Sequence, residues 1–205
     1  MNKYAIGAAV AALSVGLPAA ASAQQADPAK VVVVDTQRIY GECTVCKTAQ
    51  AQLQTQVTQL QQRAQQLGQP IQTEMQSIQQ AAQAAQAQQG QARTTAETAL
   101  QQRMAALQTR QNTANQELQG REQALRRNQA FVLQQINEKL NPVIVQVMQR
   151  RGANLAIDRG DTLAIAPAID VTNDVLAALN QQLTTINVNA PAPAAAAPQQ
   201  QPPGR

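Results

Sequence analysis

The sequence predicts an α+β, mostly α protein, in which a long antiparallel coiled-coil hairpin stands as an arm on a small β-strand body. Two observations favour this fold. Residues 47–151 are rich in glutamine and alanine and carry thinly spaced apolar residues at helical intervals. Strand-like segments occur only on either side of this stretch. The helical stretch has too little apolar surface for a globular core, so we expect it to be anchored at a body formed by its two flanks.

The N-terminus predicts export. Lys3 precedes an apolar run at residues 5–17, and Ala21, Ser22 and Ala23 form the small-x-small pattern that signal peptidase recognises. We therefore expect residues 1–23 to be a cleaved signal peptide and the mature protein to lie in the periplasm. A retained membrane anchor is the alternative, but the apolar run is short for a membrane span.

The first part of the predicted body, residues 24–46, contains one strand of four β-branched residues, which suits burial on both faces: Val31, Val32, Val33 and Val34. A lone strand leaves its backbone unpaired, so its partners must come from far along the chain or from another chain. A short helical turn is expected next, with Asp35 or Thr36 as its cap and Gly41 as its stop.

The predicted arm, residues 47–151, consists of two helices. The outgoing helix begins near Thr44, and Gly68 and Pro70 predict a bend in it. Its apolar residues alternate in steps of three and four, as in a coiled-coil seam: Leu53, Val57, Leu60, Ala64, Leu67, Ile71, Met75, Ile78, Ala82 and Ala85. The tip is expected near residues 81–95, with Gly90 at its middle.

The returning helix continues the seam with a second set of apolar residues: Leu100, Met104, Leu107, Ala114, Leu118, Leu125, Val132, Ile136, Leu140, Val143 and Val147. Gln111 and Arg121 occupy positions where the heptad favours apolar residues. These polar interruptions predict a weak zipper between the two helices.

The second part of the body is expected at residues 152–188. Gly152 ends the returning helix, and residues 154–158 and 162–166 read as two strands joined by a three-residue turn. Thr172 is predicted to cap a short helix. The tail, residues 189–205, is predicted to be disordered. The residues expected to build the β-structured body are Val31, Val32, Val33, Val34, Leu155, Ile157, Leu163 and Ile165.

Charge divides the chain. The formal net charge is +4, and residues 47–151 hold eleven basic residues against five acidic ones, whereas residues 152–190 hold one against four. The basic half predicts a negatively charged partner, although scattered arginines also simply solubilise helices. The sequence has no histidine, and only Tyr40 and Phe131 are aromatic after the signal peptide. Catalysis, a metal or other cofactor and nucleic-acid binding by base stacking are therefore disfavoured.

Cys43 and Cys46 form a CxxC motif. A redox enzyme would require a thioredoxin-like alternation of strands and helices, which the sequence lacks. A zinc site would need further ligands, which three chains meeting at the body would supply. In an oxidising compartment we expect a local structural disulfide or inert thiols.

Two segments resemble the Skp/OmpH family of periplasmic chaperones: VVVVDTQRIY at residues 31–40 and NLAIDRGDTLAIAPAIDVTNDVLAAL at residues 154–179. The resemblance covers residues 30–183. It implies a homotrimer in which the strands of three chains build the body and three arms enclose a cavity. It further implies an ATP-independent holdase that binds unfolded outer-membrane β-barrel proteins and prevents their aggregation. A structural coiled-coil spacer in the cell envelope is the rival prediction.

The predicted client-binding residues are basic or adaptable apolar side chains of the arm: Arg63, Met75, Arg93, Arg103, Met104, Arg110, Arg126 and Arg127. A methionine at helical spacing is more often part of a core, so the core of the seam is the alternative for Met75 and Met104. Some family members have a proposed lipopolysaccharide site, and Arg126 and Arg127 match its paired arginines, whereas Glu117 stands where that site has a lysine. An anionic membrane surface or lipopolysaccharide is accordingly a further predicted partner.

Overall fold

The computed structural model describes residues 28–192 of the chain. The predicted signal peptide, residues 1–23, lies outside the described residues, and so does most of the predicted disordered tail. The elements are, in order, β1 (Val31–Val34), α1 (Thr36–Glu42), α2 (Thr44–Gln86), α3 (Gly90–Arg150), β2 (Leu155–Asp158) and α4 (Thr172–Gln182), with short 3-10 turns at Arg159–Asp161 and Pro167–Ile169 between the last two.

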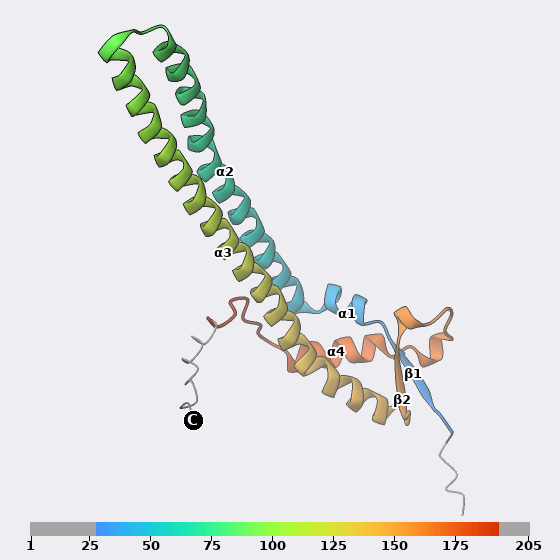
Figure 1. Cartoon of the computed structure of the whole chain (residues 1–205). Coiled ribbons are helices and arrows are strands. Elements are labelled where there is room, and N and C mark those ends of the chain that lie inside the picture. Colours follow the sequence, from blue (N-terminus) through green and yellow to red (C-terminus); the bar gives the residue numbers. More distant parts are fainter. Residues whose placement is uncertain (1–27, 193–205) are drawn as a thin grey trace, which may run out of the picture.

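The structure has the predicted fold class. Helices α2 and α3 lie side by side as a long hairpin, and β1, β2, α1 and α4 gather around the end of the hairpin opposite its tip (Figure 1). Since α2 has 43 residues, the arm is about 65 Å long at 1.5 Å per residue.

The two strands form a parallel pair, in which Val31 lies opposite Leu155 and Val34 opposite Asp158. The connection between them is the entire arm. On its other side, β1 is met at Val33, whose carbonyl accepts a hydrogen bond from the N–H of Val171 at 2.9 Å. The strand therefore finds partners within its own chain, more than a hundred residues away, and three of its four valines are buried.

The prediction of a second strand at residues 162–166 is wrong. The chain after β2 turns as a 3-10 helix because the Asp158 carboxylate accepts the N–H of Gly160 at 2.7 Å. The carbonyl of Val33 already accepts a hydrogen bond from the N–H of Val171, so it is not available to pair with residues 162–166. As a result Leu163 is fully exposed and Ile165 is half-buried instead of forming a strand of the body.

Two predicted helix boundaries also need correction. Asp35 caps α1 as expected, by accepting the N–H of Arg38 at 2.8 Å, but α1 continues through Gly41 and ends at Glu42. Thr172 is the first residue of α4 and does not cap it: its buried hydroxyl accepts the N–H of Asp35 at 2.9 Å. The Asp170 carboxylate accepts the N–H of Thr172 instead.

The ends of the arm helices follow the sequence signals. Helix α2 begins at Thr44, and the tip is a link of residues 87–89 before α3 begins at Gly90 with φ +60°. Gly152, at φ +64°, ends α3 by donating to the carbonyl of Gln149 at 2.9 Å. Pro70 lies within an uninterrupted α2, and the bend predicted there stays a prediction.

The core of the body includes the base of the arm. A single cluster joins β1 and α1 to α4 and to the last turns of α3; its fully buried side chains include Ile39, Leu140, Val143, Val147, Val175 and Leu179. The returning helix therefore contributes its C-terminal third to the body, which fixes the direction in which the arm leaves it.

After α4 the chain continues in the same direction and runs beside the base of the arm (Figure 1). We call the segment 184–190 the strap. Asn189 and Ala190, predicted to lie in a disordered tail, are hydrogen-bonded to Gln56 and Asn128 of the arm at 3.3 Å and 2.9 Å. These polar side chains of α2 and α3 account for the order of the segment.

Candidate functional site

The arm is the candidate site, and its seam is held by an uneven set of contacts. Its most buried residues beyond the body are Ile78, Ala85, Leu107 and Ala114, while many other predicted seam residues are only half-buried. A seam with so little apolar burial needs additional contacts to keep the two helices together.

Those contacts are ion pairs at the polar seam positions. Arg63 on α2 donates two hydrogen bonds to Glu117 on α3, at 2.7 Å and 2.9 Å, and Arg121 donates a third to the same carboxylate at 2.9 Å. These bonds lower the pKa of Glu117 to about 2. The bidentate bridge between Arg63 and Glu117 thus joins the two helices, and Arg121, predicted to interrupt the zipper, supports it from within α3.

A second bridge lies nearer the tip. Arg103 on α3 donates to Glu74 at 2.9 Å and to the hydroxyl of Ser77 at 2.8 Å, both on α2, and the bond from Arg103 lowers the pKa of Glu74. Arg63 and Arg103 were predicted to bind clients. Their guanidinium groups bond across the two arm helices, and their participation in client binding stays a prediction.

The remaining predicted residues are exposed on the arm. Arg93 pairs with Glu97 at 2.8 Å and Arg126 with Glu122 at 3.7 Å, each within α3. Arg110 and Arg127 make no ion pair among residues 28–192. Their participation in client binding, and that of Arg126 and Arg127 in lipopolysaccharide binding, stays a prediction.

The two methionines lie outside the core of the seam. Met75 is 41% exposed and Met104 is 58% exposed. Flexible thioethers that face solvent are available for adaptable apolar contacts, which is the role predicted for them.

A hollow of about 370 Å³ interrupts the middle of the arm. Its apolar wall is formed by Leu67, Pro70, Ile71 and Ala114, and Arg110 lies at the same place. The hollow coincides with an irregularity in the seam, where Leu67, Ile71 and Met75 follow one another in two successive steps of four residues.

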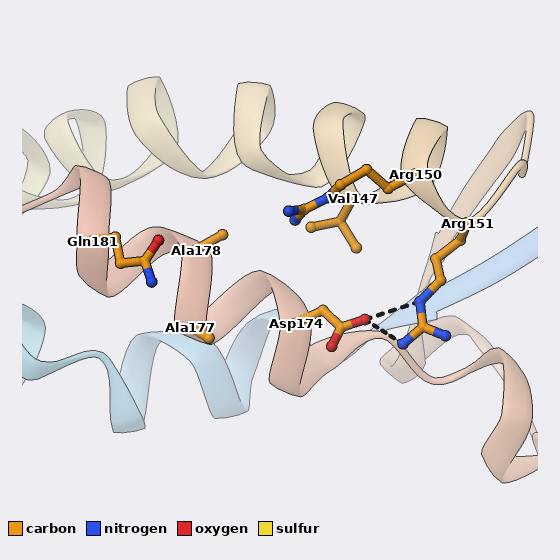
Figure 2. A pocket seen from close by; sticks show the side chains of 7 residues that line it. All are labelled: Val147, Arg150, Arg151, Asp174, Ala177, Ala178 and Gln181. Carbon is orange, nitrogen blue, oxygen red and sulfur yellow. Dashed lines mark hydrogen bonds and ion pairs between the residues drawn. The ribbon is translucent and has the colours of Figure 1, made fainter.

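A second hollow, of about 380 Å³, lies where the end of α3 meets α4 (Figure 2). Val147 and two alanines of α4 form its floor, and Arg150, Arg151, Asp174 and Gln181 surround it. The guanidinium of Arg151 donates to the Asp174 carboxylate, with Nε at 2.9 Å. The pair therefore ties the arm to the body at the C-terminus of α3.

Cys43 and Cys46 form a disulfide, so of the two predicted alternatives the structural bridge is the one found. Both residues are fully buried. Cys43 is the single residue between α1 and α2, and its sulfur accepts the N–H of Cys46 at 3.3 Å. The disulfide fixes the corner between the body and the outgoing arm.

Within residues 28–192 no helix is both long and apolar enough to cross a membrane. The same residues contain no group of three or more side chains of the types that bind metal ions.

The body of this single chain leaves apolar surface uncovered. Leu163 is 108% exposed and Leu155 in β2 is 44% exposed. Among the described residues, β2 pairs with β1 alone, so its other edge has no strand beside it. An uncovered edge and exposed leucines are features that assembly commonly covers.

Comparison with known proteins agrees with this architecture. The profile of the family described as outer membrane protein (OmpH-like) matches residues 30–179. The chain belongs to the OmpH-like family. The match includes both segments on which the resemblance to the Skp/OmpH family rests, and membership supports a chaperone role.

A solved structure extends the comparison to OmpH-like folds. The crystal structure of a candidate outer membrane chaperone (OmpH-like) from Caulobacter crescentus CB15 is 25% identical in sequence, with a TM-score of 0.63. The similarity covers 78% of this chain and 90% of that one. A search of curated proteins gave no match.

Sequence reasoning missed the polar side chains that hold the strap. Asn128 and Gln135 are half-buried residues of α3 that hydrogen-bond to it, among many glutamines that do not. The signal for the strap was present in the alternation of Ile186, Asn187, Val188 and Asn189, which is typical of an extended segment with one covered face.

We expect the cross-arm bridge to stabilise the arm above pH 4.5 and to lose this effect in acid. Because the pKa of Glu117 is lowered to about 2 in the folded state, the unfolded chain takes up its proton first, near its ordinary value of about 4.3. The advantage of the native chain over Glu117→Gln should therefore be complete at neutral pH and shrink as pH falls towards 2. Urea unfolding followed by circular dichroism measures it.

Glu97→Gln is the matched control, because Glu97 pairs only within α3, with Arg93. It should change the unfolding midpoint little at neutral pH. A difference between the native chain and Glu117→Gln that stays the same from pH 7 to pH 2 would contradict the assignment of the bridge.

Proposed function

We propose that this protein is an ATP-independent holdase chaperone of the periplasm, which binds unfolded outer-membrane proteins between the arms of a homotrimer and prevents their aggregation. The observation that carries the proposal is a long arm that is anchored at one end only. The arm stands on a body in which a single chain leaves one sheet edge and Leu163 uncovered. Membership of the OmpH-like family and likeness to a candidate outer membrane chaperone support it.

Trimerisation would complete the body. The outer edge of β2 offers unpaired backbone groups, and Leu155 and Leu163 offer apolar surface beside them. Another copy of the chain would cover both features at once, and three copies would place three arms around one axis. In this assembly the arms enclose the space in which a client is held.

The arm surface suits a client that has no fixed structure. The arm carries eleven basic and five acidic residues, so its net charge is positive even after its ion pairs are formed. This charge attracts acidic unfolded chains over a distance, while Met75 and Met104 make weak apolar contacts that select no single conformation. Holding the client apart from its neighbours prevents its exposed strands from pairing with them.

Refolding of a denatured outer-membrane barrel protein, followed by light scattering and native mass spectrometry, tests the proposal. We expect the protein to suppress scattering without nucleotide and to form a complex of three chains with one client. A stable trimer that leaves scattering unchanged would contradict the holdase and favour the rival function, a structural spacer in the envelope. Lysozyme, another protein with a net positive charge, is added at the same concentration as a control for unspecific electrostatic attraction of the client.

A further inference from the structure

The strap lies extended against the base of the arm. Ile186 and Val188 are half-buried and pack against the core cluster that includes Val132 and Ile136 of α3. Asn187 between them is exposed. The strap therefore alternates packed apolar and exposed polar side chains, as a β-strand with one covered face does.

One glutamine side chain binds the backbone of the strap. The amide of Gln135 donates to the carbonyl of Asn187 at 2.8 Å and accepts the N–H of the same residue at 3.0 Å. A strand residue exchanges two hydrogen bonds with its neighbour in the same way. Because both bonds go to main-chain atoms, they do not depend on which side chain stands at position 187.

Asn128 repeats this contact two helical turns earlier. Its side-chain oxygen accepts the N–H of Ala190 at 2.9 Å, and its amide nitrogen donates to Gln56 of α2 at 2.9 Å. The seven residues from Asn128 to Gln135 rise about 10.5 Å along α3. Between Asn187 and Ala190 the strap bends at Asn189, whose N–H is donated to the side-chain oxygen of Asn187 at 2.9 Å. The two amides therefore hold the strap at two points, on either side of this bend, as it runs antiparallel to α3.

We infer that Asn128, Val132, Gln135 and Ile136 form a binding site for an extended polypeptide with alternating apolar and polar side chains. We call this site the track. In the free protein the strap occupies the track in place of such a polypeptide. Strands of outer-membrane barrels have this alternation, so an unfolded strand of such a protein is the partner that the track fits. The inference rests on the proposed holdase function, which supplies this client, and it assigns one client contact to the base of the arm.

The strap competes with any such partner because it is tethered to α4. A tether of a few residues holds a segment at an effective concentration in the millimolar range, so a free peptide meets an occupied track. Release of the strap should consequently increase the affinity of the track for a peptide in solution.

Asn187→Pro in the full chain tests this. Proline has no N–H, so the strap loses one of its two bonds to Gln135, whereas Asn187→Ala keeps both. Both variants lose the side-chain oxygen that accepts the N–H of Asn189, so Asn187→Ala is the matched control. The probe is a labelled synthetic peptide of residues 183–192, LTTINVNAPA, which contains the strap, and its binding is measured by fluorescence anisotropy. We expect Asn187→Pro to bind it about tenfold more tightly than the native chain, and Asn187→Ala to bind like the native chain.

A second pair of variants locates the site. Gln135→Ala, added to Asn187→Pro, should remove the tenfold gain. Gln134→Ala should not, because Gln134 is exposed and bonds to Glu138 of its own helix. Circular dichroism of each variant verifies that the helices are intact, and a denatured barrel protein should displace the peptide.

The inference is overturned if Asn187→Pro binds the peptide no more tightly than Asn187→Ala, if the gain survives Gln135→Ala, or if the denatured barrel protein does not displace the peptide. The holdase proposal is judged separately, by light scattering with the unaltered chain. Suppressed scattering together with unchanged peptide binding would remove the track as a client site and leave the proposed function in place.

Discussion

Removing two heptads from each arm helix, residues 70–83 and 94–107, should abolish protection of unfolded clients and leave the assembly of the body unchanged. The deletion shortens the arm by about 21 Å. It takes out Met75 and Met104 and removes Glu74 and Arg103 together, so that neither charge is left without its partner. The bridge between Arg63 and Glu117 and the tip around Gly90 remain.

The body should tolerate this deletion because its core lies elsewhere. The described core cluster joins α1, β1 and α4 to the beginning of α2 and the last turns of α3, far from the deleted residues. Whole heptads are removed from both helices, so the apolar seam continues with only a small change of angle.

Light scattering of a refolding barrel protein and native mass spectrometry of the variant measure the two expectations. A variant that lacks one heptad from each helix, residues 77–83 and 94–100, should protect clients partially and gives the graded control. If the shortened protein no longer forms the same oligomer as the native chain, assembly does not reside in the body. If it still suppresses aggregation fully, clients are not held along the arms.

Leu140→Ala should cause the largest loss of stability among single substitutions in α3. Leu140 is 1% exposed, at the place where α3 enters the body core. Replacing a buried leucine with alanine removes apolar burial and leaves a cavity, which costs about 3 kcal/mol. For a domain of this size we expect the Tm to fall by about 6–12 °C. Thermal unfolding followed by circular dichroism measures it.

Leu133→Ala is the matched control, since Leu133 lies seven residues earlier on the same side of the same helix and is 49% exposed. The identical change of atoms should cost well under half as much there. Equal losses at the two positions would contradict the assignment of Leu140 to the body core, because alanine favours the helix slightly more than leucine at both positions.

Much of the arm is predictable because its signals are local. Apolar steps of three and four residues indicate paired helices, and Gly90 and Gly152 mark the tip and the end of α3 through their freedom to adopt positive φ. The cap at Asp35 likewise depends on a neighbour three residues away. Family resemblance then supplied the expectations about function that no local pattern provides.

The errors concern groups whose partners lie far away. Residues 162–166 have the composition of a strand, but the place beside Val33 is taken by Val171. Arg121 and Gln111 read as interruptions of the seam, yet Arg121 shares Glu117 with Arg63 in a bridge between the helices. Neither outcome follows from periodicity, because each depends on which side chain arrives from the other part of the chain.

The sequence by itself determined that two long helices form an antiparallel arm with short strands on either side, since backbone conformation and helical periodicity are set within a few residues. Tertiary structure alone decided how the polar side chains are used. Arg63 and Arg103 bridge the arm, and Gln135 holds the backbone of the strap, although they resemble many other arginines and glutamines of the chain. A polar side chain acquires its role from the partner within hydrogen-bonding distance, and folding brings together partners that are 29 to 54 residues apart.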